Sequence, residues 1–140
     1  MSSQDPRPTL VALTPEAAAA LGGAEVTLRE LPFRVGRESR GVPHAAGRTI
    51  AERRKRERHP TNELYLSERA EPFKVSREHF QIQHNGTHYV LVDRQSSCGT
   101  LVEGTVVGGR NAGGAVRLND GDVIIVGPSG SPYVFKFRIR

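Results

Sequence analysis

Apolar and polar residues alternate along much of this chain, so that every second side chain is apolar. The alternation is clearest over residues 26–29, 33–36 and 133–139. A period of two is typical of strands with one buried face, whereas a helix repeats about every 3.6 residues. Residues 15–21 are the exception, because a proline in first position and a run of alanines favour one or two helical turns, which Gly22 would end.

Residues 80–92 give the clearest local prediction, a β-hairpin. Asn85 and Gly86 lie between two alternating runs, and this dipeptide favours tight turns in which both positions have a positive φ. A two-residue loop would pair His84 with Thr87. The pairs that follow in that register are Ile82 with Tyr89 and Phe80 with Leu91. Directly paired residues share a face, so we expect these four apolar side chains to form one patch.

The whole pattern predicts an all-β protein. Further short apolar runs near residues 101–107, 116–118 and 123–126 are separated by turns rich in Gly, Asn and Asp. About ten or eleven short strands joined by such turns are typical of an antiparallel β-sandwich. The aromatic stripe of residues 133–139 is expected to lie in its core.

A length of 140 residues fits one domain. We predict a flexible polar tail over residues 1–8 and a β-sandwich domain over residues 9–140. Residues 39–62 lack the alternation and contain few core-forming side chains, so they are predicted to form a long inserted loop.

The net charge of +5 comes mostly from the segment 48–58 of this loop, which has six basic and two acidic residues. Such a segment can attract the phosphates of a nucleic acid through counterion release, or it can be a solvated loop that contacts nothing. The sequence leaves both interpretations open.

Several classes of protein are disfavoured. The longest apolar run, residues 17–21, is too short to span a membrane, and the first residues do not resemble a signal peptide, so a cytoplasmic protein without a membrane partner is expected. Cys98 is the single cysteine and the histidines do not converge, so no metal or other cofactor is expected. The glycine-rich loop 108–114 lacks the ending of a P-loop, and no nucleophile elbow is present, so we expect no enzyme.

Candidate chemistry lies in three polar clusters at predicted strand ends. These are residues 36–37 (GR), 76–79 (SREH) and 96–100 (SSCGT). Loops at one end of a sandwich are positioned by the sheets behind them and are free to bind a ligand. Arginine forks, serine hydroxyls and backbone N–H groups together suit a phosphate.

With residues 121–127 (GDVIIVG), these clusters occur in the order found in the forkhead-associated (FHA) domain, which this chain resembles over residues 10–140. The resemblance implies a β-sandwich that binds phosphothreonine. It also implies that Arg37 grips the phosphate and that Ser76 and Ser97 donate hydroxyl hydrogen bonds to it. The residues that would contact the phosphopeptide are Arg37, Lys74, Ser76, Arg77, Ser97 and Cys98. The residues that would support the site are Gly36, His79, Gly99 and Thr100.

Two features depart from the family pattern. Cys98 stands where the family has an asparagine that holds the peptide backbone, and a thiol is a poor donor, so we expect weaker clamping by about 0.5–1.5 kcal/mol. The stretch between Arg37 and Ser76 is also longer than is typical of the family.

We therefore predict a non-catalytic module that binds phosphothreonine on a partner protein and links a kinase signal to protein assembly. One alternative is nucleic-acid or polyanion binding through the basic segment 48–58. Another is a phosphate-independent scaffold that binds partners through a sheet face. The oligomeric state is left open.

Overall fold

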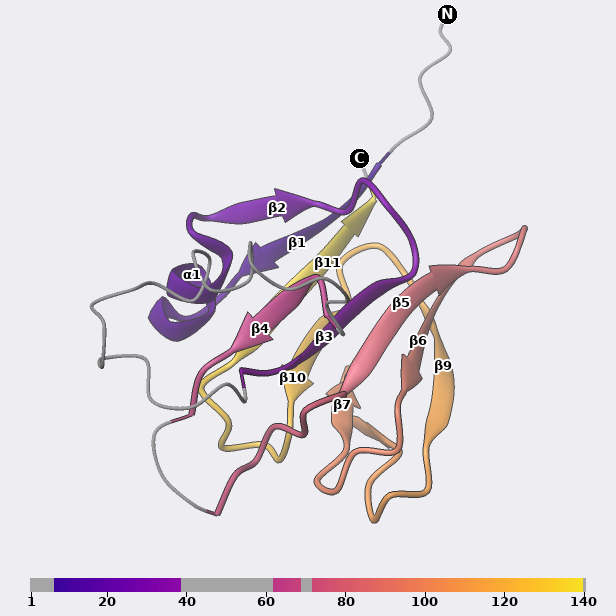
Figure 1. Cartoon of the computed structure of the whole chain (residues 1–140). Helices are drawn as coiled ribbons and strands as arrows, with labels where there is room; N and C mark the ends of the chain where they lie inside the picture. Colours follow the sequence, from indigo (N-terminus) through magenta and orange to yellow (C-terminus); the bar gives the residue numbers. More distant parts are fainter. Residues whose placement is uncertain (1–6, 39–61, 69–71, 140) are drawn as a thin grey trace, which may run out of the picture.

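The chain folds as two β-sheets packed face to face, as the computed structural model shows for residues 7–38, 62–68 and 72–139 (Figure 1). The strands of this part of the chain are β1 (Pro8–Ala12), β2 (Glu25–Thr27), β3 (Phe33–Arg37), β4 (Leu64–Leu66), β5 (Phe80–His84), β6 (Tyr89–Asp93), β7 (Thr100–Val102), β8 (Thr105–Val107), β9 (Gly114–Leu118), β10 (Val123–Val126) and β11 (Val134–Ile139). One sheet has the order β2-β1-β11-β10-β7-β8 and the other the order β4-β3-β5-β6-β9. The predicted all-β sandwich is confirmed.

One strand pair differs from the antiparallel prediction. β3 and β4 run parallel, with Val35 opposite Leu64 and Arg37 opposite Leu66. A parallel neighbour needs a connection of about a dozen residues or more, and the long stretch of sequence between these two strands provides it. Most of that stretch, residues 39–61, lies outside the described residues, and with it the predicted loop 39–62 apart from its last residue and the whole basic segment 48–58.

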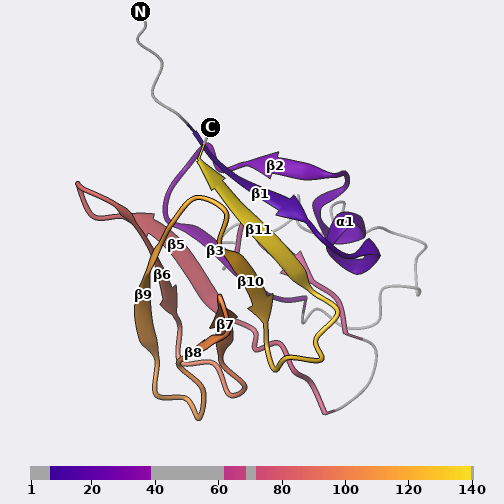
Figure 2. The same cartoon turned by 180° about the vertical axis from the view of Figure 1, so that it is seen from behind.

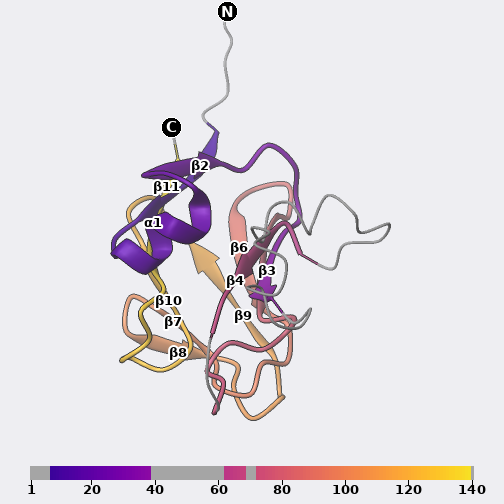
Figure 3. The same cartoon turned by 60° about the vertical axis from the view of Figure 1, so that its left-hand side comes forward.

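The short helix α1 (Pro15–Leu21) forms where the sequence predicts it. Thr14 caps its start by accepting a hydrogen bond from the N–H of Ala17, and Gly22 ends it in the left-handed conformation, with φ of 78°. The helix lies beside β1 and β2 at one margin of the sandwich (Figure 3), and Ala17 is fully buried there.

The predicted hairpin forms, but its register is wrong by two residues. His84 pairs with Tyr89, which leaves a four-residue loop in place of the predicted two-residue loop. The Asn85 side chain explains the longer loop, because its Oδ1 accepts hydrogen bonds from the N–H groups of both Thr87 and His88. Since the shift is even, every side chain keeps its predicted face.

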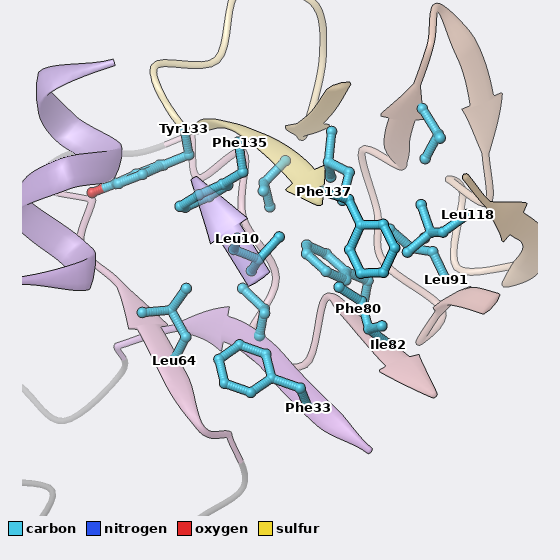
Figure 4. Close-up of a cluster of buried hydrophobic side chains, with 14 of the residues drawn as sticks. Leu10, Phe33, Leu64, Phe80, Ile82, Leu91, Leu118, Tyr133, Phe135 and Phe137 are labelled. Atoms are coloured by element: carbon cyan, nitrogen blue, oxygen red, sulfur yellow. The ribbon is translucent and has the colours of Figure 1, made fainter. Parts of the chain in front are cut away.

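The core lies between the sheets (Figure 4). Its largest fully buried members are Leu10, Leu66, Phe80, Ile82, Leu91, Leu118, Ile124, Phe135 and Phe137. The aromatic stripe of β11 points into this core, as predicted. Each such side chain contributes about 1.5–3 kcal/mol on burial, so the interior is what fixes the strand ends that carry the site.

The chain begins to pair earlier than expected. Pro8, which the sequence assigns to the tail, is the first residue of β1 and lies opposite Ile139; residues 1–6 lie outside the described part. No helix within the described residues is long and apolar enough to span a membrane.

Candidate functional site

The three polar clusters meet at one end of the sandwich, where β3 ends and β5 and β7 begin. The backbone N–H of Arg37 donates to the carbonyl of Ser76 at 2.9 Å. The N–H of Ser97 donates to Ser76 Oγ at 3.1 Å, and the two serine Oγ atoms are 3.4 Å apart. The structure therefore brings Arg37, Ser76 and Ser97 together, although they are distant in sequence. We call these three residues the rim.

The Arg37 side chain is held by two contacts that leave its outer nitrogens available. Its Nε donates to the carbonyl of Val75 at 2.9 Å, and its guanidinium carbon lies 4.1 Å from the ring centroid of Phe73. Neither Nη group is hydrogen-bonded to any residue that the structure describes. A guanidinium fixed in this way presents a fork of donors to an anion. Nothing in the sequence pattern indicated the role of Phe73.

The buried side chain of His79 joins the segment of Ser76 to the segment of Gly99. It is fully buried, its Nδ1 accepts from the N–H of Ser76 at 3.0 Å, and its Nε2 lies 2.7 Å from the carbonyl of Gly99. Because a backbone N–H can only donate, Nδ1 carries no proton, and the ring donates from Nε2. Burial lowers the pKa of His79, and the Gly99 carbonyl and Asp93 only partly oppose this effect.

The loop that carries Ser97 is organised around the buried carboxylate of Asp93, the last residue of β6. Its Oδ1 accepts from the N–H of Ser96 at 2.9 Å, and its Oδ2 accepts from the hydroxyls of Ser96 at 2.6 Å and Thr100 at 3.0 Å. Ser96 Oγ in turn accepts from the N–H of Gly99 at 3.0 Å. Asp93 and Ser96 were not among the predicted site residues, although an Asp at a strand end with a Ser three residues later is a recognisable turn signal.

Two glycines permit these close approaches. A Cβ on Gly36 would lie 1.9 Å from the carbonyl oxygen of Arg77, and a Cβ on Gly108 would lie 2.3 Å from Cγ of Asp93. The first glycine lets β3 approach the segment before β5. The second lets the β8–β9 loop pack on the Asp93 carboxylate, a contact that the sequence did not indicate.

The remaining predicted contacts surround the rim. Lys74 and Arg77 are exposed, and neither side chain is hydrogen-bonded to a described residue. The backbone that carries Lys74 is fixed, since the N–H groups of Lys74 and Val75 donate to the Glu68 carboxylate at 2.8–3.0 Å. Cys98 is half-buried, with its Sγ 3.9 Å from Ser97 Oγ.

The β8–β9 loop supports the rim from the other side. The N–H of Arg110 donates to the carbonyl of Ser97 at 2.9 Å, and that of Asn111 to the carbonyl of Ser96 at 3.0 Å. Within residues 7–38, 62–68 and 72–139, no three His, Cys, Asp or Glu side chains lie close enough to hold a metal ion. The groups that the rim and its neighbours Lys74 and Arg77 offer are hydrogen-bond donors and positive charges.

Solved structures of similar fold come from several organisms. EmbR of Mycobacterium tuberculosis, in complex with a low-affinity phosphopeptide, has 26% identity and a TM-score of 0.60; the match covers 99% of this chain and 26% of EmbR, so this chain spans about a quarter of that protein. The kinase-interacting FHA domain of an Arabidopsis kinase-associated protein phosphatase has 22% identity and a TM-score of 0.60, and the match covers 98% of this chain and 96% of that one. The FHA domain of Chlamydia trachomatis protein CT664 has 20% identity and a TM-score of 0.58, and the match covers 96% of this chain and 98% of that one. No match was found among curated proteins.

The FHA domain model matches residues 47–127, a span that contains Ser76 and Ser97 but begins after Arg37. The place of Arg37 in the site therefore rests on its contacts with Val75 and Ser76. Because the family model matches more than half of the chain and the fold agrees, this protein belongs to the FHA domain family.

Proposed function

We propose that the rim binds a phosphothreonine segment of a partner protein without catalysis and so links a kinase signal to protein assembly. The observation that carries this proposal is the meeting of three donors. Two serine hydroxyls lie 3.4 Å apart, and the backbone of Ser76 pairs with that of Arg37, whose guanidinium is already held in place by Val75 and Phe73.

A phosphate suits these donors in charge and in geometry. It brings about −1.5 to −2 charge and three acceptor oxygens, so it can take hydrogen bonds from Arg37 and from both hydroxyls at once. Lys74 and Arg77 add positive charge nearby. An unmodified threonine offers one neutral hydroxyl, which gains little from any of these groups, so the rim should distinguish the two forms.

The relatives support the proposal by chemistry as well as by fold. EmbR is described in complex with a phosphopeptide, and the Arabidopsis domain as kinase-interacting. The preference for threonine over other phosphorylated residues is proposed from the family alone.

Cys98 is expected to limit affinity. It follows Ser97 directly, at the position of the family asparagine, and its thiol is a weak donor. We propose that capture of the phosphate is retained and that the hold on the peptide backbone is looser.

The test is a degenerate phosphothreonine peptide library, followed by titration calorimetry with the best peptide and its unphosphorylated form. Arg37→Ala should weaken binding by about 10- to 150-fold, the equivalent of about 1.5–3 kcal/mol for a charged hydrogen-bonding group. Arg117→Ala is the matched control, because Arg117 is exposed on β9 opposite Val90, away from the rim. Equal affinity for the two peptide forms, or equal effects of the two arginine variants, would contradict the proposal.

A further inference from the structure

The β8–β9 loop contains a tight turn with left-handed backbone over residues 109–112. The N–H of Ala112 closes it by donating to the carbonyl of Gly109 at 3.0 Å. The two central residues, Arg110 and Asn111, have φ of 55° and 60°. Two successive positive φ values are typical of a type I′ turn, which favours Asn, Asp and Gly at both central positions. Asn111 meets that preference, whereas Arg110 does not.

Three hydrogen bonds fix this turn to the loop that carries Ser97. The N–H of Arg110 donates to the carbonyl of Ser97 at 2.9 Å. Asn111 adds two more, from its N–H to the Ser96 carbonyl at 3.0 Å and from its Nδ2 to the Gln95 carbonyl at 3.1 Å. Both loops lie at the end of the sandwich that carries the rim (Figure 1 and Figure 2). The backbone of Arg110 is therefore as close to the rim as one strand of a sheet is to the next, about 4.8 Å.

The Arg110 side chain takes no part in these contacts. It is exposed, and it forms no hydrogen bond or ion pair with a residue in the described part of the chain. Its backbone conformation is unfavourable for a long side chain, since only Gly, Asn and Asp adopt it routinely. Three of the four non-glycine residues with positive φ in the described ranges lie in these two loops. Strained backbone that persists clusters at ligand sites, so Arg110 calls for a functional explanation.

The rim and Arg110 form one series of contacts. The backbone of Arg37 pairs with that of Ser76, and Ser76 Oγ accepts from the N–H of Ser97. Ser97 in turn accepts from Arg110, which is bonded to neither Arg37 nor Ser76. Arg110 is thus the last member of the series, beyond the three donors that face one phosphate. A phosphate on the rim leaves its guanidinium available to a neighbouring part of the same peptide.

The carboxylates of the neighbouring described segments have other partners. Glu78 forms an ion pair with Arg94 at 3.1 Å. Glu68 accepts from the backbone before Ser76, at 2.8–3.0 Å, and Asp93 is buried. The Arg110 guanidinium therefore keeps its charge and its fork of N–H groups for a ligand. A planar carboxylate matches that fork in both charge and geometry.

From these contacts we propose that Arg110 selects a carboxylate of the partner, an Asp or Glu close in sequence to the phosphothreonine. The inference rests on the proposed function, because it requires the phosphate to lie on the rim. An extended peptide advances about 3.3–3.4 Å per residue, so a side chain about one to three positions away covers the step from Ser97 to Arg110. The partner segment is then an acidic phosphopeptide. A basic side chain at that position would be repelled, which adds discrimination among phosphorylated segments.

Titration calorimetry of the whole chain at about 0.15 M salt, with paired phosphothreonine peptides, tests the proposal. In each pair a single Glu or a single Gln stands at one position, and the pairs cover about three positions on either side of the phosphothreonine. The wild type should bind the Glu form about two- to fivefold more tightly at one or two positions, the range for an exposed ion pair. Arg110→Asn should abolish that preference and leave the affinity for the Gln forms unchanged. Because Asn suits the turn, the melting temperature of Arg110→Asn should not fall.

Arg117→Asn is the matched control and should keep the preference, because it removes the same charge from an exposed position on β9, opposite Val90. An equal loss for the Glu and Gln forms in Arg110→Asn would show that Arg110 binds the phosphate itself. Equal affinity of the wild type for both forms at every position would show that no carboxylate is selected. Either result overturns this inference and leaves the proposed function intact. If phosphorylated and plain peptides bind alike, the proposed function fails, and this inference fails with it.

Discussion

Acid should destabilise this domain through His79. Its ring makes two buried hydrogen bonds, and both require a neutral imidazole, with Nδ1 accepting from Ser76 and Nε2 donating to Gly99. Protonation would place a hydrogen on Nδ1, directly against the N–H of Ser76. The folded state therefore resists protonation, in agreement with the lowered pKa that burial causes.

The sign and size of the effect follow from proton linkage. In the unfolded chain His79 titrates near its ordinary pKa of about 6.5. Below that pH the unfolded chain binds a proton that the folded chain does not, so the free energy of unfolding falls as the pH falls. The slope reaches at most about 1.4 kcal/mol per pH unit and levels off once the pH drops below the folded pKa. Well above pH 7 His79 contributes no pH dependence.

Urea unfolding between about pH 5 and about pH 8 measures this slope, with His79→Gln as the reference. A glutamine offers an acceptor and a donor of similar reach but does not titrate, and both proteins share all other ionisable groups. The stability advantage of the wild type over His79→Gln should therefore shrink as the pH falls below about 6.5. Nitrogen NMR of the ring reports its protonation directly.

A constant stability difference across this range would refute the reasoning, because His79 would then titrate equally in both states. An NMR signal from a protonated Nδ1 in the folded protein at neutral pH would also refute it, since the bond from the Ser76 N–H could not then exist.

Three substitutions test other parts of the site. Gly36→Ala should lower stability by about 1–3 kcal/mol in thermal unfolding and also weaken phosphopeptide binding, because its Cβ would lie 1.9 Å from the Arg77 carbonyl oxygen; unchanged melting would contradict that contact. Phe73→Ala should reduce phosphopeptide affinity about two- to fivefold in calorimetry and leave the rest of the fold intact, because Arg37 loses a cation–π contact worth about 0.5–1 kcal/mol. If Phe73→Ala caused the same loss of affinity in a protein that already carries Arg37→Ala, the ring would not act through the guanidinium, and the prediction would be wrong. Cys98→Asn should raise affinity by a few-fold to tenfold by restoring a backbone hydrogen bond, and a lower affinity would show that the thiol is needed where it is.

The sequence predicts those parts of the fold that depend on local pattern. Period-two alternation identifies the strands, and the aromatic stripe of β11 correctly identifies the core. Pro15 and Gly22 correctly predict the bounds of α1. In each case the deciding interaction is between a residue and its near neighbours, so it can be recognised in the sequence alone.

The parts that could not be predicted depend on side-chain geometry or on distant contacts. The Asn85–Gly86 pair correctly indicated a hairpin, but the Asn85 side chain bonds inside the loop and shifts the register. Phe73 supports Arg37, and Gly108 accommodates Asp93, across long separations in the chain. The order of the motifs identifies Ser76 and Ser97 as candidate site residues, but only the folded chain shows that their hydroxyls are neighbours.

The site divides into buried groups whose hydrogen bonds all lie within the protein and surface groups that can still donate to a ligand. His79, Asp93 and Ser96 belong to the first set, whereas Arg37 and Ser97 belong to the second. A rim that is already ordered avoids the cost of fixing side chains on binding, about 0.5–1.5 kcal/mol for each long one. Changes to the buried set should therefore lower stability and affinity together, because the rim loses its support. Changes to the surface set should lower affinity more than stability, since in the unbound fold Arg37 uses only its Nε and Ser97 Oγ makes only long contacts, at 3.4 and 3.9 Å.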